Sequence, residues 1–187
     1  MAWYEKVKDA VYDMLCSTFG ADPEAQTSLD RFVPAYTDNV TTPQYNSNDN
    51  VCFYTLSEEQ GTSVDYVSEE TDGKHILITS NIPISLLLTF YGPKAYDDAE
   101  YFWSRAMVDN GSGSPRSVLR KNQITYRGRP VRPVTSPELE GTLWRNRCDV
   151  RVPLVYLNVD QVDAGMIEEA PEVTVLTTAD PGESIEP

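Results

Sequence analysis

The 187-residue sequence contains a single histidine, His75. One histidine excludes the HExxH zinc motif and any metal cluster built from several imidazoles. His75 follows an Asp-Gly-Lys stretch at the expected start of a strand. We therefore interpret it as an exposed hairpin residue, and not as a proton shuttle.

Cysteine is also scarce, and long hydrophobic runs are missing. The three cysteines, Cys16, Cys52 and Cys148, are odd in number and far apart, which excludes a CxxC zinc site and disfavours a disulfide framework. We expect buried thiols in a reducing compartment. No apolar run approaches the roughly 20 residues of a membrane span. The first residues, MAWYEKVKDAVYDML, do not show the basic and apolar regions of a secretory signal.

Other catalytic arrangements are missing as well. The acidic pairs Glu58-Glu59 and Glu69-Glu70 lie in expected strands, where neighbouring side chains point to opposite faces. The Gly-Ser-Gly at residues 111–113 is not followed by the Gly-Lys-Ser/Thr of a phosphate-binding loop. No set of residues fills the roles of nucleophile, base and stabiliser. The sequence therefore predicts a protein that is not an enzyme and uses no cofactor and no metal.

Basic residues are few, but they are concentrated in one stretch. The formal net charge is -14, yet residues 116–151 hold nine lysines and arginines against three acids. We predict that this stretch contacts a neighbouring subunit or a partner protein. The candidate residues are Arg116, Arg120, Lys121, Arg127, Arg129, Arg132, Arg147 and Arg151. A solvated charged face and a nucleic-acid-binding module remain alternatives.

The first half of the chain predicts a helix, an arm and a β-meander. Apolar residues at three- and four-residue spacing indicate an amphipathic helix over residues 3–19 that ends at Gly20. Residues 21–50 contain three prolines and predict an extended arm or loop. Strands are expected at residues 51–58 and 62–70, followed by a tight Asp-Gly turn and a long alternating strand. Pro83 requires that this strand be an edge, kinked or split.

The best-patterned segment is LLLTFYGPKAYDDAEYFWSRAM, residues 86–107. It predicts a strand, a hinge at Gly92 and an amphipathic helix with Pro93 in its first turn. Small alanines allow the helix to lie close to a sheet, so we expect this unit to pack the core. The expected core residues are Leu86, Leu88, Phe90, Gly92, Ala95, Ala99, Phe102 and Trp103.

The remaining chain is expected to be mostly β. A short helical turn is predicted for residues 115–121, and an edge strand or exposed arm for residues 123–134, because Pro130 and Pro133 cannot donate to a ladder. Residues 136–141 read as a loop, and the stretch from Trp144 to Val162 as a strand with one buried face. A last strand is expected at residues 172–176. We predict one domain over residues 1–178 and an acidic tail over residues 179–187.

The order of these elements resembles the bacteriophage neck or tail-terminator proteins. In that family a strand with Tyr-Gly followed by spaced alanines leads into the main helix, and a later strand has the form R-x-D-x-x-V-x-x-x-Y. The resemblance extends from about Trp3 to Leu176. The matching residues are Leu88, Phe90, Tyr91, Gly92, Ala95, Ala99, Arg147, Asp149, Val152 and Tyr156.

The resemblance implies an α+β fold with a mixed, largely antiparallel sheet and helices on one face. It also implies a virion structural protein, assembled in the host cytoplasm, that forms a hexameric ring. Such a ring caps the head-proximal end of the tail tube and joins it to the head-completion or connector proteins, while DNA passes through the lumen. The arm at residues 21–50 and the acidic tail depart from the family pattern. The alternative is another head-tail joining or tail-tube-like structural protein.

Overall fold

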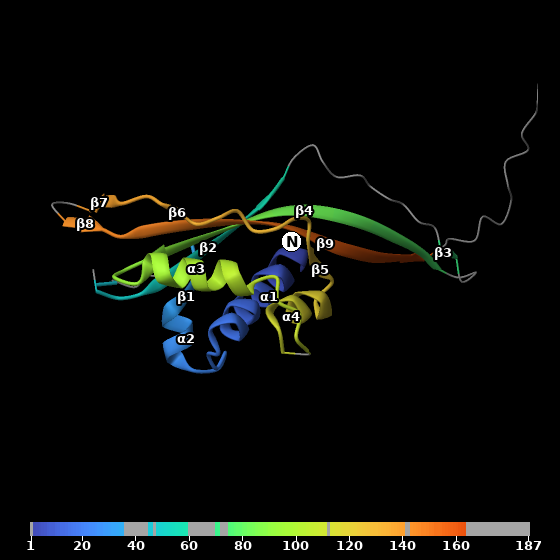
Figure 1. The fold of residues 1–187 in the computed structure, drawn as a ribbon. Helices are drawn as coiled ribbons and strands as arrows, with labels where there is room; N and C mark the ends of the chain where they lie inside the picture. Colours follow the sequence, from blue (N-terminus) through green and yellow to red (C-terminus); the bar gives the residue numbers. More distant parts are fainter. Residues whose placement is uncertain are drawn as a thin grey trace, which may run out of the picture.

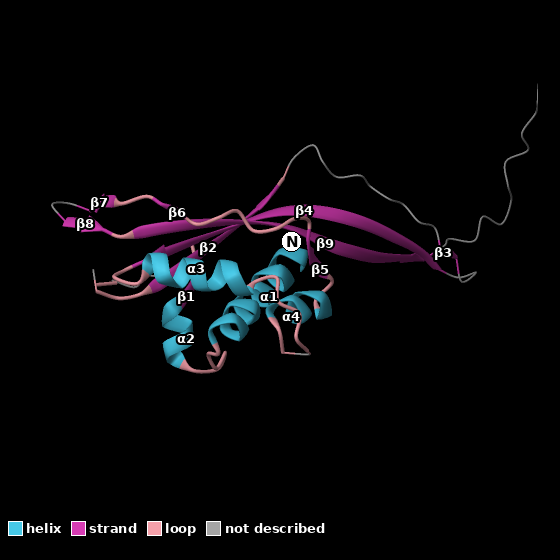
Figure 2. Cartoon of the chain, viewed as in Figure 1, coloured by secondary structure: helices cyan, strands magenta, loops and turns pink. Residues whose placement is uncertain are grey.

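A computed structural model of the chain describes residues 2–35, 45–46, 48–59, 70–71, 75–111, 113–140 and 143–163. In this part of the chain all four helices lie on one side of a β-sheet (Figure 1). The colouring by secondary structure in Figure 2 shows the same two layers, with the strands above the helices. This arrangement confirms the α+β class with helices on one face.

The sheet is mixed and mostly antiparallel, as expected. Within the described residues it contains seven strands, and only β1 and β2 are parallel neighbours. Along the sheet the order is β1 (Phe32–Pro34), β2 (Val51–Glu58), β4 (His75–Tyr91), β9 (Arg147–Asp163) and β5 (Ile124–Tyr126). The short strands β3 (Glu70–Thr71) and β6 (Val134–Thr135) pair with β4 and β9, and a separate ribbon consists of β7 (Glu138–Glu140) and β8 (Leu143–Arg145).

Strands β4 and β9 form the spine of the molecule. They pair antiparallel over all 17 residues of each strand, from His75 opposite Asp163 to Tyr91 opposite Arg147. At about 3.3 Å per residue this spine is roughly 55 Å long. The helices cover only part of it, and one end of the spine continues past the helix layer (Figure 1). The opposite end carries the β7–β8 ribbon.

Pro83 lies inside β4 without splitting it. In an antiparallel pair the N–H and C=O of one residue point to the same neighbouring strand. The carbonyl of Pro83 accepts a hydrogen bond from the N–H of Glu59 at 3.0 Å, so its missing N–H faces β2 and not β9. Pairing with β2 ends there, because Glu58 opposite Ile84 is the last pair. Of the three alternatives, the split is excluded because β4 continues through Pro83, and the strand becomes an edge there on the β2 side.

Helix α1 (Ala2–Phe19) confirms the first predicted helix and its end. Gly20 adopts a φ of 63°, and the N–H of Ala21 donates to the carbonyl of Cys16 at 2.9 Å. This pairing is the helix-ending pattern that a glycine in the left-handed region makes possible. The buried side chains of α1 pack against the inner face of the sheet; they include Val7, Val11, Met14 and Leu15.

The loop prediction for residues 21–50 is wrong for residues 26–34. That stretch forms helix α2 (Gln26–Arg31) and strand β1, which pairs with β2 from Phe32 opposite Cys52 onward. The N–H of Ala35 extends this pairing by donating to the carbonyl of Tyr54 at 2.9 Å. A helix of six residues is too short to show the apolar period that sequence reading relies on. Residues 36–44 and 47 lie outside the described residues.

The strand-to-helix unit is present, with Gly92 at the hinge. Gly92 has a φ of 106°, and a Cβ placed on it would lie 3.0 Å or less from atoms of Asp49 and Asn50. The side chain of Asn50 accepts a hydrogen bond from the N–H of Lys94 at 2.8 Å. Helix α3 (Ala95–Arg105) starts after this contact. Pro93 therefore lies two residues before the helix, and not in its first turn.

The inner face of the sheet and the helices enclose one apolar core. It includes Leu86, Leu88, Phe90, Ala95, Ala99 and Phe102, and Gly92 is buried beside it. Trp103 differs from these expected core residues, because it is only half-buried and lies outside the core. Its indole N–H donates to the carbonyl of Pro130 at 3.0 Å. The reason is the helical period, which directs Phe102 inward and its neighbour Trp103 toward the sheet edge.

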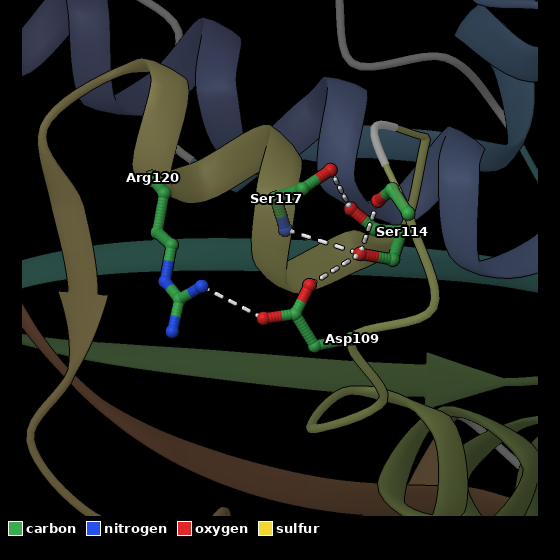
Figure 3. A network of polar contacts seen from close by, with 5 residues as sticks. Asp109, Ser114, Ser117 and Arg120 are labelled. Atoms are coloured by element: carbon green, nitrogen blue, oxygen red, sulfur yellow. Dashed lines mark hydrogen bonds and ion pairs between the residues drawn. The ribbon is translucent and has the colours of Figure 1, made fainter.

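Helix α4 (Pro115–Lys121) confirms the predicted short helical turn, and a polar network holds its start (Figure 3). The Ser114 hydroxyl accepts a hydrogen bond from the N–H of Ser117 at 3.3 Å and donates to Asp109 at 3.3 Å. Asp109 also pairs with Arg120 at 2.7 Å. The network fixes the loop before α4 to the helix itself.

The chain after α4 follows the free edge of β9. Only residues 124–126 form strand β5, and the N–H groups of Arg127 and Val131 then donate to carbonyls of Pro153 and Arg151. The loop expected at residues 136–141 contains strand β7 instead. The strand expected from Trp144 onward is interrupted at Asn146, between β8 and β9.

Several predicted features lie largely or wholly outside the described residues. Of the strand expected at residues 62–70, only Glu70 is described, and it belongs to β3, which pairs antiparallel with β4. The turn at residues 72–74, the strand at residues 172–176 and the acidic tail at residues 179–187 are not among them.

Candidate protein interface

The β7–β8 ribbon is fixed to the sheet by a cluster of polar contacts at the end of β4 and β9. The hydroxyl of Tyr91 donates to Glu138 at 2.7 Å, and Arg147 donates to the same carboxyl oxygen at 3.3 Å. Arg147 also makes two hydrogen bonds of 3.0 Å to Asp149. Two parallel N–H···O bonds of this kind are the strongest geometry available to an arginine and a carboxylate. Glu138 thus connects the ribbon to the end of the spine, at Tyr91 and Arg147.

The electrostatics of this cluster follow from its hydrogen bonds. The pKa of Glu138 is lowered from its ordinary value, with the hydrogen bond from Tyr91 as the largest cause and Arg147 as a further one. Burial, assisted by the hydrogen bond to Glu138, raises the pKa of Tyr91 to about 12. The pKa of Arg147 is raised, first by its bond to Asp149. Near neutral pH the cluster therefore holds a charged carboxylate, a neutral phenol and a charged guanidinium.

A shallow hollow lies beside this cluster on the sheet face opposite the helices. Its volume is about 470 Å³, and its lining includes Phe53, Thr55, Leu87, Thr89, Tyr91, Leu139 and Arg145. The rings of Tyr45, Phe53 and Tyr91 meet edge to face, with centroid distances of 5.4 and 5.8 Å. The guanidinium of Arg145 lies 5.3 Å from the centre of the Tyr91 ring. Aromatic rings together with arginine are enriched at protein–protein interfaces.

The ribbon itself presents apolar surface. Leu139 and Trp144 are opposite each other across β7 and β8, so their side chains share one face of the ribbon. Leu139 is 55% exposed and Trp144 is 71% exposed. A large aromatic side chain left this exposed is typical of a contact surface for another molecule.

The eight basic candidates do not form one patch. Arg147 and Arg151 alternate with Asp149 along the outer face of β9, whereas Arg116, Arg120 and Lys121 lie on α4 on the helix side. The remaining three, Arg127, Arg129 and Arg132, follow the free edge of β9.

Most of these basic side chains are engaged within the chain. Arg120 pairs with Asp109 at 2.7 Å, Arg127 with Glu59 at 2.8 Å and Arg132 with Glu100 at 3.8 Å. The guanidinium of Arg129 lies 4.2 Å from the centre of the Trp103 ring. Carboxylates of the same chain therefore balance three of these four charges.

The sequence did not reveal the residues that dominate this site: Tyr91 as a hydrogen-bond donor, Glu138, Leu139 and Trp144. Tyr91 and Glu138 are 47 positions apart, and no motif connects them. One signal was available. Leu143 and Trp144 are β-prone, and the pair Gly141-Thr142 before them includes a glycine, as a two-residue hairpin loop often does.

A second hollow, of about 610 Å³, lies near α2 and the start of α3. Its lining includes Asp30, Asp49, Asp98, Arg31 and Lys94. Arg31 pairs with Asp98 at 3.0 Å across it. In the described ranges no three acidic, histidine or cysteine side chains are grouped so that they could hold a metal ion. Among the helices described here, none has the length and apolar character of a membrane span.

Within the described residues, a sheet with helices on one face and an exposed apolar ribbon define a class: an α+β protein whose surface suits contacts with other proteins. The family model described as "Phage neck terminator protein" matches residues 5–182. The chain therefore belongs to the phage neck terminator protein family, which confirms the resemblance, and it is a structural component of the phage particle. No curated protein matches the chain.

Proposed function

We propose that the protein forms a hexameric ring that caps the head-proximal end of the tail tube. The ring joins the tube to the head-completion or connector proteins, and DNA passes through its lumen as cargo. The observation that carries this proposal is the family match, which spans residues 5–182 and so includes both the helix layer and the spine.

The shape of the subunit supports a closed assembly. Its two ends differ, because one end of the spine carries the β7–β8 ribbon and the other, where β3 pairs with β4, extends past the helix layer (Figure 1). Contacts between unlike surfaces repeat from copy to copy and close into a ring when the rotation permits. A subunit with one self-complementary patch would form a closed dimer instead.

The charge of the chain supports the passage of DNA. The formal net charge is -14. An acidic lumen repels the phosphate backbone and prevents the duplex from adhering during ejection. We therefore expect acidic side chains to face the channel and the stretch of residues 116–151 to face neighbouring proteins.

The chain is proposed to act as one domain over residues 1–178 with an acidic tail over residues 179–187. It acts by shape and needs no catalytic group, cofactor, metal or membrane. Assembly takes place in the host cytoplasm, and the final location is the neck of the virion.

Native mass spectrometry on the full chain, alone and mixed with tail-tube subunits, tests the proposal. The expected species is a ring of six 21.0-kDa chains, formed alone or on tube ends. A chain that stays monomeric in both samples contradicts the ring. A chain that instead adds to tubes and lengthens them identifies a tail-tube-like protein, the alternative function.

A further inference from the structure

Two exposed apolar surfaces lie at opposite ends of strand β9. The first is the pair Leu139 and Trp144 on the β7–β8 ribbon, which precedes β9 in the chain. The second is the pair Leu157 and Val159, near the far end of β9. The two surfaces are unlike: one is a narrow ribbon, and the other is the flat face of the spine.

The apolar face of the ribbon is left exposed by the described part of its own chain. The ribbon has three residue pairs, and a two-stranded ribbon of this size is marginal in water. Among the described residues its side-chain anchors include Glu138, which accepts hydrogen bonds from Tyr91 and Arg147, and Arg145, which donates to the carbonyl of Asn46 at 3.4 Å. Leu139 and Trp144 contribute little to the fold while they face water. Packing against another surface would bury both.

The second surface, at Leu157 and Val159, is apolar and could pack against the ribbon. Leu157 is 38% exposed and Val159 is 42% exposed, and a spacing of two places them on the same face of β9. That face is the one opposite the helices, because Leu154 and Tyr156 point into the core. The residues opposite them on β4, Asn81 and Thr79, are uncharged. An apolar ribbon can therefore lie here without removing water from a charge.

The two surfaces cannot meet within one chain. From Arg147 to Val159 the extended strand covers roughly 40 Å at about 3.3 Å per residue, and continuous pairing with β4 keeps it extended over that length. Contact between the surfaces therefore requires two copies. One copy then uses its ribbon and the next its spine, which is the head-to-tail geometry that leads to rings.

We propose that the β7–β8 ribbon of one subunit packs, through Leu139 and Trp144, on the outer face of the next subunit's spine at Leu157 and Val159. This inference rests on the proposed ring, and it assigns the surfaces that close it. Each subunit uses both surfaces once. Trp144 is the anchor of the contact, since tryptophan contributes more than other residues when buried at an interface.

Complementary variants test the assignment by native mass spectrometry, alone and with tail-tube subunits. Trp144→Glu removes the ribbon surface and Val159→Glu removes the spine surface, and each is expected to be monomeric under conditions where the unchanged chain forms rings. An equal mixture of the two retains one intact pair of surfaces, so it is expected to form dimers containing one copy of each and nothing larger. A contact between identical surfaces would not give this result.

The matched control is Val108→Glu, an exposed apolar residue at 41% that follows α3 and belongs to neither surface. It is expected to form rings like the unchanged chain. Rings formed by Trp144→Glu or Val159→Glu would overturn this inference and leave the proposed function standing. An unchanged chain that never forms rings, with or without tube subunits, would overturn both.

A second measurement covers the case in which the charged variants fold poorly. The double variant Leu139→Cys and Val159→Cys is expected to give a ladder of disulfide-linked subunits under mild oxidation, and neither single variant should give it. The three native cysteines are buried, so they provide little background. Absence of the ladder from rings of the double variant would also overturn the inference.

Discussion

Two separate constraints require a glycine at position 92. Its φ of 106° lies in a region that side chains with a Cβ rarely adopt. The space for a Cβ is also taken by backbone and side-chain atoms of Asp49 and Asn50. This close approach connects the segment before β2 to the hinge between β4 and α3.

We predict that Gly92→Ala lowers the free energy of unfolding by at least about 2 kcal/mol, from backbone strain and overpacking together. Gly113→Ala is the matched control, since a Cβ there meets nothing within 4 Å, and its effect should stay within about 0.5 kcal/mol. Urea unfolding followed by circular dichroism measures both. Equal stability of the two variants would contradict this account of the hinge.

Glu138 gives the ribbon contact a dependence on pH. Its pKa is lowered in the folded chain from 4.5, chiefly by the Tyr91 hydroxyl. A carboxyl with a lowered folded pKa contributes stability that is complete above its unfolded pKa and is lost as the pH falls through the folded pKa. The contribution should therefore be present at pH 7 and disappear in the acid range below about pH 4.5.

We predict that Tyr91→Phe moves the pKa of Glu138 upward, toward 4.5, because the largest cause of the shift is removed. Carbon-13 NMR of the Glu138 carboxyl measures the titration directly. The stability difference between the unchanged chain and the variant should be less than about 1 kcal/mol, since the pair is partly exposed, and it should shrink as the pH falls. An unchanged titration midpoint in Tyr91→Phe would refute the assignment of the contact.

At the scale of single elements, α4 depends on its first residues more than on its length. It has seven residues, and isolated helices this short do not form in water. The Ser114 hydroxyl accepts a hydrogen bond from the N–H of Ser117, which has no partner within the helix. Asp109 connects Ser114 to Arg120 (Figure 3).

We predict that Ser114→Ala lowers the free energy of unfolding by about 1 kcal/mol, the usual cost of losing an N-cap. Ser104→Ala, at an exposed serine near the end of α3, is the control and should change stability by less than about 0.5 kcal/mol. Thermal unfolding of the three proteins provides the comparison. A Ser114→Ala chain as stable as the control would mean that the network does not hold the helix.

The elements that could be predicted from sequence are those with a long, regular pattern or a strong stop. Helix α1 shows its apolar period over several turns and ends at Gly20, and β2 has the bounds expected, Val51–Glu58. The unit from β4 through Gly92 to α3 was recognisable because the period changes from two to 3.6 at a glycine. The family resemblance depended on the same segment.

The elements that were missed are short or owe their form to distant partners. Strand β1 forms because β2 is beside it, and α2 is too brief to display a period. The sequence predicts a loop where β7 forms, since Glu138 and Glu140 have low β-propensity. The strand forms through pairing with β8 and through the contact between Glu138 and Tyr91. Such tertiary contacts override local preference and leave no local pattern.

At the scale of the whole molecule, the distribution of covered and uncovered surface is the main feature. The helices cover the inner face of the sheet over only part of the spine, and the end of the spine near β3 extends past the helix layer (Figure 1). A protein that acted alone would have little reason to leave Trp144 and Val159 in water. In a ring these ends are where copies meet.

The most direct measurement is cryo-electron microscopy of the neck in the phage particle that contains this protein. The account predicts a single ring of copies between the end of the tail tube and the head connector, with the β7–β8 ribbon of each copy on the spine of the next. Copies stacked along the tube, or an assembled neck without this chain, would contradict it.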